Sequence, residues 1–222
     1  MSKLLTILIF LLIFLSGCIQ SNKDISHMSD IEIGGNIEFG GYRWIVLDVN
    51  GERALIIAEN IVDRRPLSES NSATTWEYSC IRYWLNNDFY NSLTFSDRNQ
   101  IIASEIINDN NRWFESYAGQ NTVDHIFLLS LEDIFQYLGG VTQGDVWNEY
   151  VGMVGVWDER NDERVAYDTN GEAHWWWLRS PGQHDNFNAN ISINGTIMMQ
   201  GISSDNQGGG VRPAMWINLE NC

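Results

Sequence analysis

Two short stretches of similar make-up constrain the fold of this chain more than any other feature. The sequence reads WWWLRSPG at residues 175–182 and GGGVRPAMW at residues 208–216, so each stretch combines strand-forming aromatic or aliphatic residues with an arginine and a proline. Between them, apolar and polar residues alternate over 189–193 and 196–201 around Asn194-Gly195, which is a hairpin pattern. We therefore expect these segments to form a central antiparallel sheet, with the earlier chain packed onto it.

The first part of the chain predicts a β-meander. Apolar, aromatic and β-branched residues alternate over 31–39, 42–49 and 53–58. Asn50-Gly51 stands between the last two of these runs, where it is a strong signal for a tight hairpin turn.

The middle of the chain predicts short helices. Ser79 is a suitable N-cap for a helix over residues 80–90, whose apolar face carries Ile81, Trp84, Leu85 and Phe89. We also expect a helix from Ser96 to about residue 102, a buried strand over 127–129, and a helix over 131–138 capped by Ser130. Residues 141–173 are acidic and irregular, as functional or mobile loops are. The expected class is α+β, with an N-terminal β-meander, two or three short helices and a central antiparallel sheet.

The first residues predict export. Lys3 precedes an apolar run over 4–15 that is shorter than the about 20 residues of a membrane span. LSGC at residues 15–18 is similar to the lipobox of prokaryotic lipoproteins, which implies a signal peptide over 1–17 and a lipid on Cys18. A polar tether over 18–30 and a single domain over 31–222 would follow. The protein would lie on the outer face of the cell membrane, or in the outer membrane of a Gram-negative cell. An ordinary signal peptide or signal anchor with an incidental Cys18 is the alternative.

The composition of the chain limits the kinds of molecule that it can bind. The formal net charge of −16 argues against the basic surface that a nucleic-acid-binding protein needs, so we expect no nucleic-acid partner. Ten tryptophans indicate either a core of aromatic packing or an aromatic binding surface. In an exported protein, Cys80 and Cys222 allow a disulfide, but Cys80 also suits a small buried position in a helix.

Five motifs carry a family resemblance. They are F-G-x-Y-x-W-x-V-L-D at 39–48, W-E-x-S-x-x-R-x-W-L-N at 76–86, F-L-L-S at 127–130, W-L-R-S-P-G at 177–182 and G-V-R-P-A at 210–214. Together they resemble an uncharacterised group of bacterial and archaeal domains that is often found on exported proteins. The last two are also similar, more distantly, to the C-type-lectin-like superfold, which formylglycine-generating enzymes share. That resemblance implies a mixed domain with long loops gathered on one side, but such a fold hosts many functions and does not supply one.

No residue pattern indicates a catalytic centre or a specific metal site. Arg179 and Arg212 stand beside aromatic residues at strand ends, where a guanidinium either ties loops to the sheet or holds an anion or a sugar. Asp158, Asp162 and Asp168 are weak calcium candidates, because they lack the spacing of an EF-hand loop. Acidic loop residues are also often simply solvated.

The sequence therefore favours a non-catalytic protein that binds a surface glycan or an envelope protein. We expect the binding surface to come from residues 141–173, 174–185 and 203–210. Two other functions stay open: an unrecognised enzyme of the formylglycine-generating-enzyme-like superfold, and a purely structural envelope module. The candidate ligand-binding residues are Trp157, Trp175, Arg179, His184, Asp185 and Arg212. No cofactor is expected, apart from calcium as a candidate.

Overall fold

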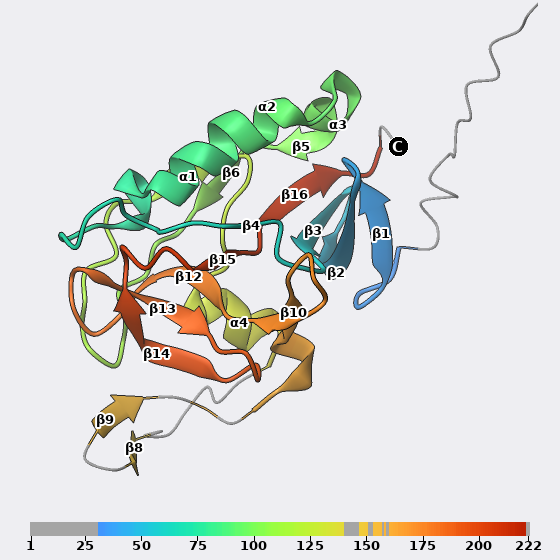
Figure 1. The fold of residues 1–222 in the computed structure, drawn as a ribbon. Coiled ribbons are helices and arrows are strands. Elements are labelled where there is room, and N and C mark those ends of the chain that lie inside the picture. The colour runs from blue at the N-terminus through green and yellow to red at the C-terminus, as the bar shows by residue number, and fades with distance from the viewer. Residues whose placement is uncertain (1–30, 140–146, 151–152, 157, 159, 221–222) are drawn as a thin grey trace, which may run out of the picture.

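The structure is a computed structural model that describes residues 31–139, 147–150, 153–156, 158 and 160–220. Within these residues the chain builds two five-stranded sheets, three two-stranded ribbons and a few short helices, which is an α+β architecture. In Figure 1 the first sheet lies at the right, the second at the lower left, and α1 and α2 run across the top. None of the helices among the described residues has the length and apolar character needed to cross a membrane.

The first sheet contains the predicted meander. The Asn50–Arg53 pair closes the hairpin between its second and third strands, and Gly51 has the positive φ of 62° that such a turn needs. Its order is β1-β2-β3-β16-β5, and the neighbouring strands are antiparallel. The strands are β1 (Asn36–Phe39), β2 (Tyr42–Asn50), β3 (Arg53–Ala58), β16 (Ala214–Asn218) and β5 (Ile101–Ile102).

The second sheet contains the predicted 175–201 strands. Gly195, with a φ of 78°, lies in the turn between the β13 and β14 strands, as the sequence predicted. The sheet is mixed rather than purely antiparallel, because β12 and β15 run parallel and pair at Trp176 and Gly210. Its order is β14-β13-β12-β15-β4, with β14 (Ile197–Ser203), β13 (Phe187–Ile191), β12 (Trp176–Pro181), β15 (Gly210–Val211) and β4 (Asp63–Arg64).

Residues 210–218 contribute one strand to each of the two five-stranded sheets. β15 pairs with β12 and β4 in the second sheet, and β16 pairs with β3 and β5 in the first. Between them lies Pro213, whose carbonyl accepts a hydrogen bond from Ala58 N at 2.8 Å. Gly209 is required where this segment passes Trp177, because a Cβ there would lie 1.6 Å from the indole Nε1.

The predicted helices form with shifted ends. Ser79 caps α1 (Cys80–Trp84), which continues through a π-helical turn (Leu85–Phe89) into α2 (Tyr90–Ser92). The helix expected over 96–102 is α3 (Phe95–Gln100), with a Thr94 capping box, and it ends early because the next two residues pair with β16. Ser130 and Asp133 form the capping box of α4 (Leu131–Tyr137), as predicted.

Two expectations about irregular or strand structure were wrong. Residues 127–129 are buried but form only a single bridge, between Phe127 and Ala214. Part of the segment expected to be irregular forms short ribbons: β8 (Trp147–Tyr150) pairs with β9 (Met153–Val156), and β10 (Ala166–Tyr167) pairs with β11 (Ala173–His174). A third ribbon joins β6 (Ser104–Ile106) to β7 (Thr122–Asp124).

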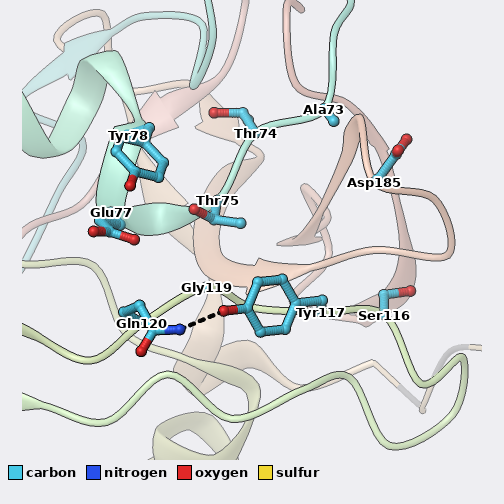
Figure 2. A pocket seen from close by; sticks show the side chains of 10 residues that line it. All are labelled: Ala73, Thr74, Thr75, Glu77, Tyr78, Ser116, Tyr117, Gly119, Gln120 and Asp185. Carbon is cyan, nitrogen blue, oxygen red and sulfur yellow. Dashed lines mark hydrogen bonds between the residues drawn. The ribbon is translucent and has the colours of Figure 1, made fainter.

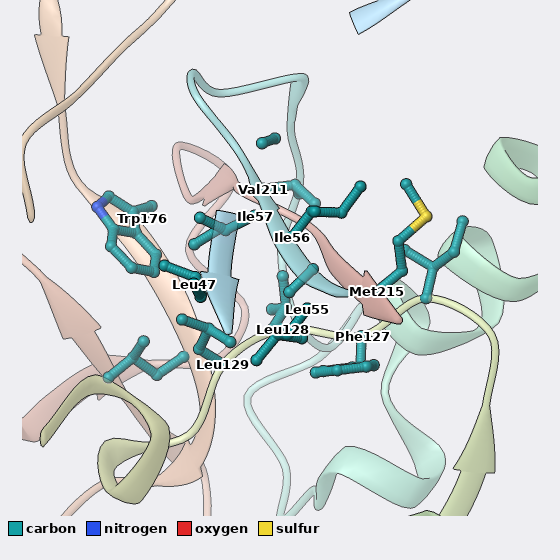
Figure 3. Packing of buried hydrophobic residues seen from close by; sticks show 14 of the residues in the cluster. Leu47, Leu55, Ile56, Ile57, Phe127, Leu128, Leu129, Trp176, Val211 and Met215 are labelled. Carbon is teal, nitrogen blue, oxygen red and sulfur yellow. The ribbon is translucent and has the colours of Figure 1, made fainter. Parts of the chain in front are cut away.

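The hydrophobic core lies between the two sheets and the 127–129 segment (Figure 3). Four of its largest side chains are fully buried tryptophans, and each indole N–H has an acceptor, as burial of this residue requires. The donors and acceptors are Trp44 to Phe39 O, Trp76 to Asp124 Oδ2, Trp176 to Arg164 O and Trp177 to Arg65 O. The tryptophans whose side chains the structure describes are therefore part of the core or packed against it.

Candidate functional site

Arg179 lies in a set of contacts within the chain. Its side chain is 6% exposed, and its Nη1 donates to Asp133 Oδ2 at 2.5 Å and to Leu128 O at 2.7 Å. The neighbouring Ser180 Oγ accepts from Leu131 N at 3.0 Å. Arg179 and Ser180 thus attach the start of α4 to β12. Of the two roles considered for Arg179, this contact pattern is that of a residue that ties a loop to the sheet.

Arg212 is also buried, with 1% of its surface exposed. Its Nε donates to Ala58 O at 2.8 Å, and its guanidinium carbon lies 4.9 Å from the centre of the Trp176 ring. Burial lowers the pKa of Arg212 to about 10, and the negative charge of Glu59 partly opposes this shift. The guanidinium therefore keeps its charge at neutral pH, inside the domain rather than on a ligand-facing surface.

The three acidic calcium candidates have separate surroundings. Asp158 is buried and pairs with Arg164 at 2.7 Å, and its other oxygen accepts from Ile197 N at 2.6 Å. Asp162 pairs with the exposed Arg160. Asp168 accepts two backbone N–H groups in its own turn, which lowers the pKa of its carboxyl. In the part of the chain that the structure describes, no three His, Cys, Asp or Glu residues are grouped to hold a metal.

The other candidates are dispersed. Trp175 is partly buried, with its ring 6.0 Å from that of His174 and 4.8 Å from that of Trp177. His184 is exposed and meets the ring of Phe187 edge-on at 5.1 Å. Trp157, Cys18 and Cys222 lie outside the described residues, so their predicted roles and the disulfide stay predictions.

Asp185 alone among the candidates lines a groove of about 570 Å³ (Figure 2). That volume lies within the range of about 300–1,000 Å³ that is usual for small-molecule sites. Three segments meet there: residues 73–78 before α1, residues 116–120 between β6 and β7, and the turn between β12 and β13 that carries Asp185. We call it the Tyr78–Tyr117 groove, and its lining residues are Ala73, Thr74, Thr75, Glu77, Tyr78, Ser116, Tyr117, Gly119, Gln120 and Asp185.

A buried anchor holds the first wall of the groove. Trp76 is fully buried and donates to Asp124 Oδ2 at 2.9 Å, while Arg82 Nε donates to Asp124 Oδ1 at 2.7 Å. The 3-10 turn Trp76–Tyr78 consequently sends the buried indole inward and leaves Tyr78 76% exposed on the groove side. Trp76 and Arg82 of the 76–86 motif therefore hold the first wall of the groove in place.

The second wall is a loop tied down by asparagines. Asn111 is 1% exposed and donates through Nδ2 to Pro181 O and Met199 O, at 2.8 and 2.9 Å. Asn110 Oδ1 accepts from Ala118 N at 3.0 Å. Glu115 adopts a φ of 57°, a conformation that residues other than glycine rarely take, directly before the groove residues Ser116 and Tyr117. These contacts fix the conformation of the loop, in which 60% of the surface of Tyr117 is exposed.

The groove combines two exposed aromatic rings with oxygen-rich polar groups. The charge of Glu77 and a hydrogen bond to its carboxylate raise the pKa of the Tyr78 hydroxyl, so this phenol stays protonated at neutral pH. Tyr117 Oη accepts from Gln120 Nε2 at 2.6 Å. Thr75 Oγ1 is buried at the groove floor and has no hydrogen-bond partner among the described residues.

Sequence reasoning missed most of this site. Tyr78 and Tyr117 are far apart in the chain, and neither stands in the segments expected to form the binding surface. The 76–86 motif lies at one wall of the groove, where Tyr78 is exposed between the buried Trp76 and Ser79. The pairing of this turn with a loop about 40 residues later had no signal in the periodicity.

The comparisons with known proteins give a family. No curated protein and no solved structure matched the chain. A family model described as a domain of unknown function, DUF6273, matches residues 51–219, which is more than half of the chain and includes every residue that lines the groove. The chain therefore belongs to the DUF6273 family of domains of unknown function.

Proposed function

We propose that the protein is a non-catalytic carbohydrate-binding protein held at the outer face of a membrane by a lipid on Cys18. The observation that carries the binding proposal is the groove of about 570 Å³ between two exposed tyrosines. The distant C-type-lectin-like resemblance is part of the same proposal, and the mixed α+β architecture with its Arg-bearing β12 and closing strands is compatible with it.

The chemistry of the groove suits a saccharide. A pyranose presents a C–H face that packs on an aromatic ring, and Tyr78 and Tyr117 offer two such rings at low conformational cost. Its hydroxyls need acceptors and donors at the rim. The carboxylates of Glu77 and Asp185 are acceptors, and the Ser116 hydroxyl and the Gln120 amide act as both.

Two carboxylates in a sugar site raise the question of glycoside hydrolysis, which uses such a pair. A general acid must hold its proton near neutral pH, and proteins achieve this by apolar burial of the carboxyl. Asp185 is exposed to solvent, and Glu77 is only partly buried. This favours binding over catalysis. Release of reducing ends from a bound oligosaccharide would contradict it and support the enzyme alternative.

The test is a glycan array with the full-length protein in detergent, run with calcium and with EDTA. We expect binding in both conditions, because the groove holds no calcium-like set of carboxylates. Tyr78→Ala and Tyr117→Ala should each weaken binding at least about fivefold, which corresponds to about 1 kcal/mol. Tyr167→Ala is the matched control, since Tyr167 is 48% exposed on β10 and does not line the groove. Unchanged binding by both groove variants would refute the proposed site, and silence of the folded protein would favour a structural module or a protein partner.

The anchor has an independent test. Cys18→Ser should release the protein from membranes into the soluble fraction, because burial of acyl chains supplies the attachment. Retention of the Cys18→Ser protein in the membrane fraction, at the level of the unchanged chain, would contradict lipidation and support a signal anchor.

A further inference from the structure

We propose that the Tyr78–Tyr117 groove selects saccharides that carry free, protonated amino groups. This inference rests on the proposed carbohydrate function and names the ligand class for the same site. It is carried by the combination of one sign of charge and two exposed aromatic rings around a single cavity.

The charged groups of the groove have one sign. Glu77 and Asp185 are both lining residues, and none of the described lining residues is Lys, Arg or His. Figure 2 shows the two carboxylates on opposite sides of the pocket, with Thr75 between them. A neutral sugar would offer these carboxylates only its hydroxyl groups as donors, whereas an ammonium group adds the attraction between opposite charges to the hydrogen bond.

The guanidinium of Arg82, which lies close to Glu77, already has a carboxylate partner. Arg82 pairs with Asp124 at 2.7 Å and donates through Nη1 to Glu77 O at 3.0 Å. This guanidinium thus fixes the backbone that carries Glu77 and has its own carboxylate partner. The Glu77 carboxylate lines the groove beside Tyr78 (Figure 2), whose neutral hydroxyl leaves the negative charge of the carboxylate for a ligand.

The tyrosine rings favour the same ligand. An ammonium group above an aromatic face is attracted by the negative ring surface, and two tyrosines flank the groove. The Tyr117 oxygen already accepts from Gln120, which orients the phenol and holds the ring against the groove. An amino sugar places C–H groups and an ammonium on one ring, so it can use stacking and charge together.

The whole chain strengthens this preference. A formal net charge of −16 raises the local concentration of cationic ligands and lowers that of anionic ones. This long-range part is screened over about 10 Å at 0.1 M salt, while contacts inside the groove are screened less. Added salt should therefore reduce the preference for amines without abolishing it.

The test uses one oligosaccharide in two forms: a short glucosamine oligomer, and the same oligomer after N-acetylation. Affinities are measured with the full-length protein in detergent at pH about 6, below the ordinary pKa of an amine. We expect the amine form to bind about tenfold more tightly. Glu77→Gln and Asp185→Asn should each weaken binding of the amine form about three- to fivefold and leave the acetylated form within twofold. Asp162→Asn is the matched control, because Asp162 is exposed and lies outside the groove.

The outcomes separate the two proposals. Equal affinity for both forms would overturn the amine preference and leave the carbohydrate function standing. Binding of neither form, by a protein whose unfolding transition is intact, would overturn both. An oligolysine of equal charge that competes as well as the glucosamine oligomer would also overturn the inference, because charge alone would then explain the affinity.

Discussion

Asp124 offers the sharpest test of how the groove wall is held. Its carboxylate is 1% exposed and accepts three hydrogen bonds, from Trp76 Nε1 at 2.9 Å, Arg82 Nε at 2.7 Å and Thr122 Oγ1 at 2.7 Å. In Asp124→Asn the side chain keeps its size but exchanges one acceptor oxygen for an N–H₂ group. In either orientation of the amide, its N–H₂ group faces another donor, which is Trp76 Nε1 in one case and Arg82 Nε in the other. The negative charge next to Arg82 is lost in both.

The expected cost follows from burial. Breaking a fully buried ion pair costs about 3–5 kcal/mol, and a hydrogen bond to a charged group contributes about 1.5–3 kcal/mol. The Arg82 side chain is 27% exposed, so solvent recovers part of the loss. We therefore expect Asp124→Asn to lower the free energy of unfolding by about 3 kcal/mol. For a domain of this size that corresponds to a fall in Tm of about 6–12 °C.

The assay is urea unfolding of the full-length protein in detergent, with Asp162→Asn as the control. Asp162 pairs with Arg160 on the surface, where both side chains are more than two-thirds exposed, and such a pair contributes about 0–1 kcal/mol. A double-mutant cycle with Arg82→Met should give a coupling energy of at least about 1 kcal/mol. A loss below about 1 kcal/mol in Asp124→Asn, matching the control, would refute the view that this carboxylate anchors Trp76 and Arg82.

Two further changes test other parts of the structure. Gly119→Ala should destabilise the protein by about 1–3 kcal/mol and weaken saccharide binding, because Gly119 has a φ of 91° and a Cβ there would lie 2.7 Å from Thr75 Oγ1; wild-type stability and affinity would contradict this geometry. Arg179→Met should lower the free energy of unfolding by about 3 kcal/mol or more, because Asp133 loses its ion-pair partner and the Leu128 carbonyl loses a buried donor. A loss of saccharide binding with unchanged stability would instead make Arg179 a ligand residue.

Local signals predicted the elements that local physics determines. The Asn50-Gly51 hairpin, the Ser79 cap and the Ser130 capping box all formed at the predicted residues, because each depends on neighbours within a few positions. The shift of the third helix shows the limit. Ile101 and Ile102 continue an apolar pattern that fits a helix, but β16 offers them a strand partner, and that partner lies more than 100 residues later.

The candidate groove was harder to predict than the elements, for a physical reason. Arg179 and Trp175 attracted attention because charged and aromatic residues are chemically conspicuous, yet the structure uses Arg179 to hold α4 and places Trp175 against the core. Tyr78 and Tyr117 lie in turns without periodicity, and only the tertiary contacts of Trp76 and Asn111 bring their loops together. Asp185 was predicted as part of the 174–185 segment, and it lines the groove from the turn between β12 and β13.

The division of residues 210–218 between the two sheets has a kinetic consequence. β16 separates β3 from β5, and β15 separates β12 from β4, so neither sheet can close before these residues are synthesised. Pairings of such high sequence separation make a high contact order, and domains of this kind fold slowly. During synthesis the meander, the β12-β13-β14 hairpins and the capped helices can form from local residues, but both sheets acquire their last strands only at the end of the domain. Since only Arg212 and Pro213 separate β15 from β16, pairing of either strand holds the other next to its own sheet.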